Sequence, residues 1–126
     1  MTLPAPARRV LVADDNADAA DSLAALLTLF DCTVQVAYSG SEALALGDQH
    51  RPQLVILDIA MPHMDGCETA RRMRARPWGR QACIAALTAC GDDELPCSTA
   101  EAGMDFHLTK PVSADVLLAV LASVRA

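Results

Sequence analysis

The sequence has few aromatic residues and no long apolar run. Aromatic side chains make up 3% of the 126 residues, so a core must be built from Ala, Leu, Val, Ile and Met. No apolar run approaches the roughly 18 residues that a membrane-spanning helix needs. The N-terminus also lacks the long apolar stretch of a signal peptide. These absences predict a soluble cytoplasmic protein with no membrane insertion.

A basic surface is also missing from the sequence. The formal net charge is −6, whereas a domain that binds nucleic acid carries a clustered basic footprint. We therefore expect no nucleic-acid partner. The chain length fits one domain, which we place at residues 8–126, after an N-terminal arm or linker over residues 1–7.

The cysteines follow no metal-ligand or disulfide-framework pattern. There are five of them, an odd number, and no C-x-x-C pair occurs. A zinc site or a secreted disulfide framework would show different spacing. We expect reduced thiols that fill small spaces in the core.

What the sequence does contain is an alternation of two periodicities. Short apolar runs indicate strands, and segments with apolar residues at helical spacing lie between them. The expected strands cover residues 9–13, 33–37, 54–57, 82–88 and 105–109. The first helix is expected over 17–30, and the second follows an N-cap at Ser39. The third is expected from an N-cap at Asp65 to about Arg76, and the last from an N-cap at Ser113 through Ala122 or beyond. The fourth should be short and start near Leu95 or Pro96, because proline is tolerated only in the first turn of a helix.

This alternation defines the predicted fold class. Strands that alternate with helices form right-handed crossovers, a parallel sheet and helical layers on both faces. The sequence therefore predicts an α/β protein with a doubly wound, five-stranded parallel sheet. The strand order to expect is 2-1-3-4-5.

Four of the five expected strands end on a polar residue. The first runs into Asp14 and Asp15, the third into Asp58, the fourth into Thr88 and the fifth into Lys110. The carboxyl ends of parallel strands lie along one edge of the sheet, where ligands bind. Because strands 1 and 3 are neighbours in the expected order, the three carboxylates should converge there.

The chemistry of such a set is specific. Clustered carboxylates are unfavourable unless one is protonated or a cation joins them, and Mg²⁺ takes oxygen ligands shared between carboxylates, water and phosphate. A lysine binds phosphate as a point charge, and a threonine hydroxyl can donate to a phosphoryl oxygen. No Walker-type loop is present to cradle a nucleotide. The set fits transfer of a phosphoryl group onto a carboxylate, and the central Asp58 is the best nucleophile.

These residues, in this order, resemble the receiver domain of two-component response regulators. The resemblance covers about residues 8–125 and is carried by the segments VADDN, DIAMPHMDG, Thr88 and HLTKP. The sequences of these segments are most similar to those of receivers attached to hybrid sensor histidine kinases. The family's aspartate accepts a phosphoryl group from a histidine kinase or a histidine phosphotransfer domain, so the resemblance implies one of these as partner. A weak homodimer is a further expectation.

The resemblance also implies a role for each acid. Asp58 would be the phosphoacceptor and a ligand of Mg²⁺. Asp15 would bind the ion directly and Asp14 through water, and the backbone carbonyl of Ala60 would complete the protein ligands.

The remaining implied roles concern the strand-end cation and the conformational switch. Lys110 would pair with the acids and then with the phosphoryl group. The Lys110–Pro111 peptide bond is often cis in this family. Thr88 would hydrogen-bond the phosphoryl group once it has formed. His107 stands at the family's switch position, where Tyr or Phe is common. Because histidine titrates near neutral pH, we expect activation to be modestly pH-sensitive between pH 6 and 8.

Two other functions compete with a signalling module. One is a Mg²⁺-dependent phosphatase with a strand-end aspartate nucleophile, but Ala60 stands where such an enzyme carries its second acid. The other is a pseudo-receiver that binds partners without phosphorylation. The complete set of site residues disfavours it.

Overall fold

The structure, a computed structural model, describes residues 8–88 and 99–124. Strands alternate with helices along the chain. The strands are β1 (Arg8–Ala13), β2 (Cys32–Ala37), β3 (Leu54–Asp58), β4 (Cys83–Thr88) and β5 (Phe106–Thr109). The helices are α1 (Ala17–Leu29), α2 (Gly40–His50), α3 (Gly66–Arg74) and α4 (Ala114–Ser123), with a single 3-10 turn, η1 (Trp78–Arg80).

All strand pairs are parallel, and the sheet order is β2-β1-β3-β4-β5. The predicted fold class and strand order are therefore confirmed. In the register, Ala13 pairs with Leu57 and Asp58 with Leu87. The strands that precede Asp14 and carry Asp58 consequently end side by side.

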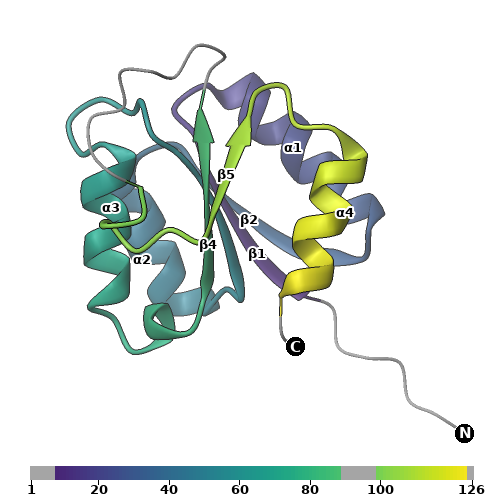
Figure 1. Cartoon of the computed structure of the whole chain (residues 1–126). Helices are drawn as coiled ribbons and strands as arrows, with labels where there is room; N and C mark the ends of the chain where they lie inside the picture. Colours follow the sequence, from purple (N-terminus) through teal and green to yellow (C-terminus); the bar gives the residue numbers. More distant parts are fainter. Residues whose placement is uncertain (1–7, 89–98, 125–126) are drawn as a thin grey trace, which may run out of the picture.

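Helices cover both faces of the sheet (Figure 1). One core cluster joins β-strand residues such as Leu11 and Leu57 to α2 and α3, and the other joins Val12 and Ile56 to α1 and α4. Neighbouring strand residues thus face opposite helical layers, as the two-residue period of a strand requires. This explains why the central strands are apolar on both faces and why β3 is buried throughout.

Side-chain caps fix the start of each α-helix, in the loop that follows a strand. The side chains of Asn16, Ser39, Asp65 and Ser113 each accept a hydrogen bond from the amide three residues ahead. The predicted caps Ser39, Asp65 and Ser113 are confirmed. At α1 the cap is Asn16, so neither Asp14 nor Asp15 is used for capping.

The end of α3 differs from the prediction by two residues. Helix α3 ends at Arg74 rather than near Arg76, because the amides of Ala75 and Arg76 bond carbonyls three residues back and tighten the last turn. Residues 99–103 form turns. The predicted start of a short helix at Leu95 or Pro96 lies outside the described residues, as does the predicted arm over residues 1–7.

The prediction of reduced cysteines is wrong at Cys67, which is disulfide-bonded. Cys32 and Cys83 form no disulfide, as predicted. Cys90 and Cys97 lie outside the described residues. Sequence spacing could not reveal the bond because it does not show which distant cysteines approach one another.

The described helices were compared with the length and apolar character of a membrane-spanning helix. None of those within residues 8–88 and 99–124 has the length and apolar character needed to cross a membrane.

Candidate functional site

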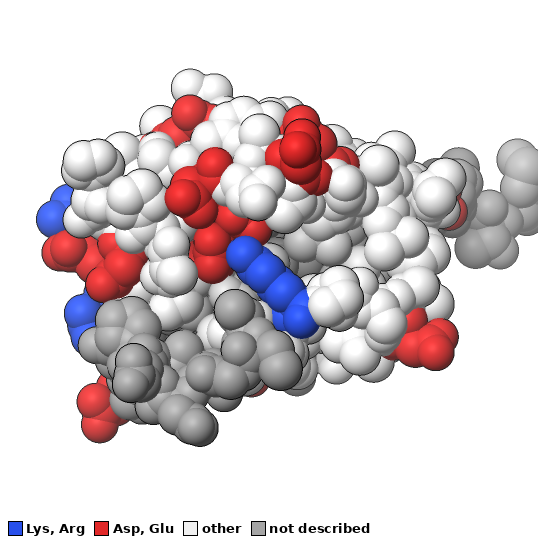
Figure 2. All heavy atoms as spheres, turned by 90° about the horizontal axis from the view of Figure 1, so that it is seen from above, with Lys and Arg blue, Asp and Glu red and all other residues white. Residues whose placement is uncertain are grey.

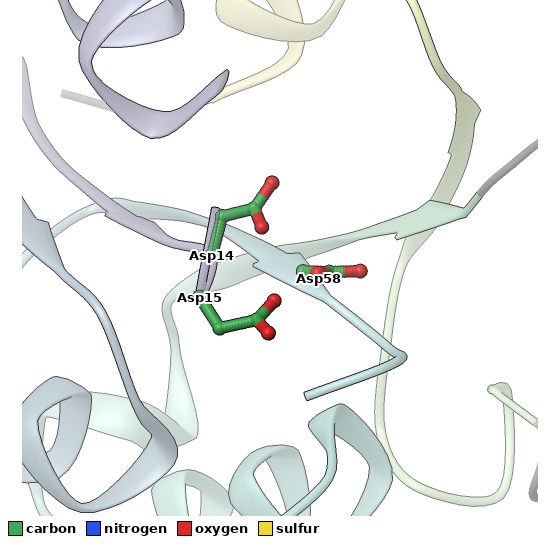
Figure 3. A group of neighbouring side chains, drawn as sticks. All are labelled: Asp14, Asp15 and Asp58. Atoms are coloured by element: carbon green, nitrogen blue, oxygen red, sulfur yellow. The ribbon is translucent and has the colours of Figure 1, made fainter. Parts of the chain in front are cut away.

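Acidic side chains gather where the parallel strands end. Figure 2 looks onto this face and shows several acids around one hollow, with a basic side chain beside them. Asp14 and Asp15 follow β1, and Asp58 ends β3; in Figure 3 their carboxylates point toward a common space. One oxygen from each of the three lies within 4.8 Å of the others.

Asp14 is held in place by the loop that it begins. Its side chain is 1% exposed, and its Oδ1 accepts a hydrogen bond from the Asn16 amide at 3.0 Å. The Asp14 amide in turn donates to the Ala37 carbonyl of β2. These bonds leave Oδ2 directed at the lysine described below, while Asp15 is exposed.

Asp58 lies at the centre of the site and is also buried, at 4% exposure. Its Oδ1 accepts a hydrogen bond from the Ala60 amide at 3.2 Å. Helix α3 starts directly against this backbone, since a Cβ added to Gly66 would lie 2.5 Å from the Asp58 carbonyl oxygen. The Gly66 amide also donates to the Ile59 carbonyl. The glycine therefore allows α3 to pack against the strand end that carries Asp58.

Lys110 brings a cation to the acids from the end of β5. Its Nζ lies 3.1 Å from Asp14 Oδ2 and 3.5 Å from Asp58 Oδ2. The Lys110 amide donates to the Thr88 carbonyl, which ties β5 to β4 at this edge. The Lys110–Pro111 peptide bond is cis, as the resemblance implies.

The single ammonium of Lys110 does not balance the negative charge of the three carboxylates. Burial, followed by the hydrogen bond and charge of Asp14, raises the pKa of Asp58 from 3.8 to about 6. Burial disfavours the charged form of Lys110, but Asp14 and Asp58 outweigh it and raise the pKa of the ammonium. A second cation would relieve the repulsion between the carboxylates.

The donor set fits Mg²⁺. Hard divalent cations take oxygen ligands, and Mg²⁺ is usually held by one or two carboxylates with water or phosphate in its other positions. Three carboxylates converge here, two of them buried and one open to solvent. The buried Asp58 is disfavoured as an anion without a further positive charge, which is the condition that a metal ion corrects.

Thr88 and His107 pair with one another across the neighbouring strands β4 and β5. The hydroxyl Oγ1 of Thr88 lies 2.9 Å from His107 Nε2 and also donates toward the Leu108 carbonyl at 3.3 Å. Thr88 is 4% exposed and His107 is exposed. The structure thus brings Lys110 to Asp14 and Asp58, and it joins Thr88 to His107.

Two residues of the site region were missed by reasoning from sequence. Asn16 caps α1 and also donates its amide to Asp14, and Gly66 permits the close approach of α3. The Asp-Asp-Asn order offered a signal for the first, because Asn is a strong N-cap residue. The close contact at Gly66 depends on packing that local sequence does not specify.

Comparison with known proteins gives a consistent result. The response regulator receiver domain family matches residues 10–122. An uncharacterized 14.6 kDa protein of Leptolyngbya boryana is 39% identical over 103 residues, which are 82% of this chain and 79% of the relative. The response regulator MprA of Mycobacterium ulcerans is 36% identical over 111 residues, which are 88% of this chain and 47% of MprA. This chain therefore spans about half the length of such regulators.

Solved structures agree with the sequence matches. The chemotaxis protein CheY4 of Vibrio cholerae superposes with a TM-score of 0.83 at 26% identity, over 94% of this chain and 99% of the other. A CheY-like receiver domain protein of Methanospirillum hungatei superposes with a TM-score of 0.82 at 26% identity, over 93% and 92% of the two chains. The fold, the acidic cluster and the match over residues 10–122 together show that this chain belongs to the response regulator receiver domain family, a family of signalling modules.

Proposed function

We propose that residues 8–126 form a receiver that accepts a phosphoryl group onto Asp58 and changes conformation in response. The observation that carries the proposal is the convergence of Asp14, Asp15 and Asp58 within 4.8 Å, with Lys110 paired to two of them. The donor in this proposal is a histidine kinase or a histidine phosphotransfer domain, and the site of action is the cytoplasm, where such kinases use ATP. The relatives reported above are regulators or uncharacterized, so attachment to a hybrid kinase stays a prediction.

In the transfer step, a carboxylate oxygen of Asp58 attacks phosphorus. The new phosphorus–oxygen bond forms as the phosphorus–nitrogen bond of the donor phosphohistidine breaks, and the bonding electrons return to the histidine ring. Oδ1 of Asp58 is held by the Ala60 amide, so the side chain is oriented before the donor arrives. Lys110 is placed to balance charge on the transferred group, because its ammonium already contacts Asp58 Oδ2.

The ion would be held by Asp14, Asp15, Asp58 and the Ala60 carbonyl. When bound, Mg²⁺ supplies positive charge that favours ionised Asp58 and offsets charge on the phosphoryl oxygens. Ionised Asp58 is the nucleophilic form, and a bound cation would favour it further against the burial and the Asp14 charge that raise the pKa of Asp58 to about 6.

The product would change the balance of charge at the edge of the sheet. A phosphoryl group adds about −1.5 to −2 charge and three acceptor oxygens. Thr88 holds a hydroxyl proton that such an acceptor could receive, once the hydroxyl turns from its present partners. Phosphorylation can shift the balance between two conformations of the domain only by as much as the phosphoryl group stabilises one of them more than the other.

The test is intact mass after incubation with acetyl phosphate and Mg²⁺. Wild type should gain the mass of one phosphoryl group, and Asp58→Asn should gain none. Asp18→Asn, a change at an exposed acid in the first turn of α1, is the matched control and should behave as wild type. No adduct on wild type, and no conformational change with beryllofluoride, would refute the proposal.

A further inference from the structure

A second hollow opens at the opposite edge of the sheet, where the strands begin. It has a volume of about 710 Å³. Its lining includes Arg9, Arg51, Gln53, Trp78, Gln81 and Ser123. None of the acidic site residues takes part. A smaller hollow of about 370 Å³ shares Arg51 and Trp78 with it.

Two arginines of this groove have guanidinium nitrogens that make no hydrogen bond to the described residues. Arg9 donates from Nε to the Arg51 carbonyl at 3.0 Å. Within the described part of the chain, the terminal nitrogens of Arg9 and the whole guanidinium of Arg51 make no hydrogen bond or ion pair. Arg51 also ends α2 in the left-handed region, at φ 51 and ψ 64, where glycine or asparagine is usual. An arginine is thus held there against its backbone preference.

Trp78 forms a fixed planar wall beside these cations. Its indole Nε1 donates to Asp48 Oδ1 at 2.9 Å. The ring packs so closely on Gly47 that an added Cβ would lie 2.2 Å from Cζ2. These contacts anchor the loop that carries Trp78. The negative charge of Asp48 is matched by Arg76 at 2.5 Å, so it does not cancel the two arginines.

The groove is positive on a protein that is negative overall. The chain carries a formal charge of −6, and its acidic cluster lies at the other edge of the sheet. The groove lining contains two arginines and no acidic residue. A small anion would therefore be repelled from the opposite end and attracted to this one.

We propose that this groove binds a nucleoside phosphate, that is, a small organic anion in which a phosphate is joined to a planar ring. Guanidinium groups match phosphate oxygens in bidentate geometry, and an indole face offers a surface for stacking a base. The exposed amide of Gln81 can meet the polar edge of the ring. The volume falls within the range of about 300–1,000 Å³ that small-molecule sites occupy.

Intrinsic fluorescence tests the proposal directly, because Trp78 is the only tryptophan in the chain. The probe is ADP, titrated with EDTA present so that no divalent ion bridges it to the acids, and with excitation at wavelengths that adenine does not absorb. We expect saturable quenching of Trp78. Binding should weaken at least about tenfold in the double variant Arg9→Gln, Arg51→Gln, because two charged hydrogen-bond donors are lost.

The matched control removes two positive charges elsewhere. Arg71 and Arg72 are exposed on α3 and do not line the groove, so Arg71→Gln, Arg72→Gln should bind ADP as wild type does. Adenosine and inorganic phosphate, tested separately, should each bind more weakly than ADP. Equal affinity for phosphate and ADP, equal loss in the control variant, or no fluorescence change up to about 10 mM ADP would overturn the proposal. The result is independent of phosphorylation at Asp58.

Discussion

The hydroxyl of Thr88 lies 2.9 Å from Nε2 of His107. A threonine hydroxyl has one proton to donate and can accept two hydrogen bonds. The hydroxyl also lies 3.3 Å from the Leu108 carbonyl, to which it can donate. Whether Nε2 accepts or donates depends on the tautomer of the ring. With Nε2 as acceptor the threonine proton is directed at the ring, and with Nε2 as donor it is directed at the carbonyl. In both cases the hydroxyl must turn before it can donate to a phosphoryl oxygen on Asp58.

We expect His107→Phe to raise the yield of phosphorylated protein, because the Thr88 hydroxyl loses a partner that it must leave before it can donate to a phosphoryl oxygen. With acetyl phosphate and Mg²⁺ at pH 7, the change should be about two- to tenfold, the range expected for one hydrogen bond. The measurement is the phosphorylated fraction by intact mass under matched conditions. Equal yields in the two proteins would contradict the prediction.

Asp58 should make the metal-free protein less stable as pH rises. Its carboxyl binds a proton up to about pH 6 in the folded state but only to about pH 4 when unfolded. The folded state therefore holds the extra proton between these values, and the free energy of unfolding falls as pH increases through them. The loss approaches about 3 kcal/mol for a shift of this size.

Asp58→Asn removes this penalty. In EDTA, urea unfolding should find the variant more stable than wild type at pH 7 by up to about 3 kcal/mol, with the difference shrinking toward pH 4. Mg²⁺ should narrow the gap at pH 7, because it stabilises the ionised wild type by binding the folded state. Stability curves that stay parallel across this pH range would count against the assigned shift.

Arg74 should contribute more to stability than any other surface arginine of α3. It donates to the carbonyls of Gly79, Ala82 and Gly103 and pairs with Asp105 at 2.8 Å. Arg74→Met leaves these acceptors without the charged donor and should cost about 3 kcal/mol of unfolding free energy.

The control for Arg74 is Arg72→Met. Arg72 is half exposed and makes a single pair with Glu68, one turn away, so its loss should change stability by less than about 0.5 kcal/mol. Urea unfolding at pH 7 measures both. Similar losses in the two variants would show that the Arg74 contacts add little.

Gly66→Ala should impair the site without touching any charge. The new Cβ would fall 2.5 Å from the Asp58 carbonyl and 2.7 Å from Ile59 Cα, both backbone atoms that cannot rotate away. We expect a loss of about 1–3 kcal/mol in stability and a lower yield of phosphorylated protein under conditions where the variant is folded by circular dichroism. A variant that is both stable and fully phosphorylated would show that α3 can move aside without consequence.

The sheet and most of the acid cluster could be predicted because both depend on local signals. Apolar runs identify strands, the caps Ser39, Asp65 and Ser113 mark helix starts, and parallel connectivity places Asp14 beside Asp58. The contacts of Arg74 could not be predicted in this way. They join α3 to backbone carbonyls up to 29 positions away, which any residue type would provide, and to the carboxylate of Asp105, 31 positions away. The groove at Arg9 and Arg51 and the disulfide of Cys67 escaped prediction for the same reason.

Helix α3 also connects the two ends of the molecule mechanically. Its first residue, Gly66, rests on the backbone of Asp58, and its last, Arg74, clamps the segments that flank Trp78 and precede β5. Nine helical residues span roughly 12 Å as one rigid rod. A shift of the Asp58 backbone would therefore displace the whole helix. The position of Arg74 at its far end would then change with the position of Asp58.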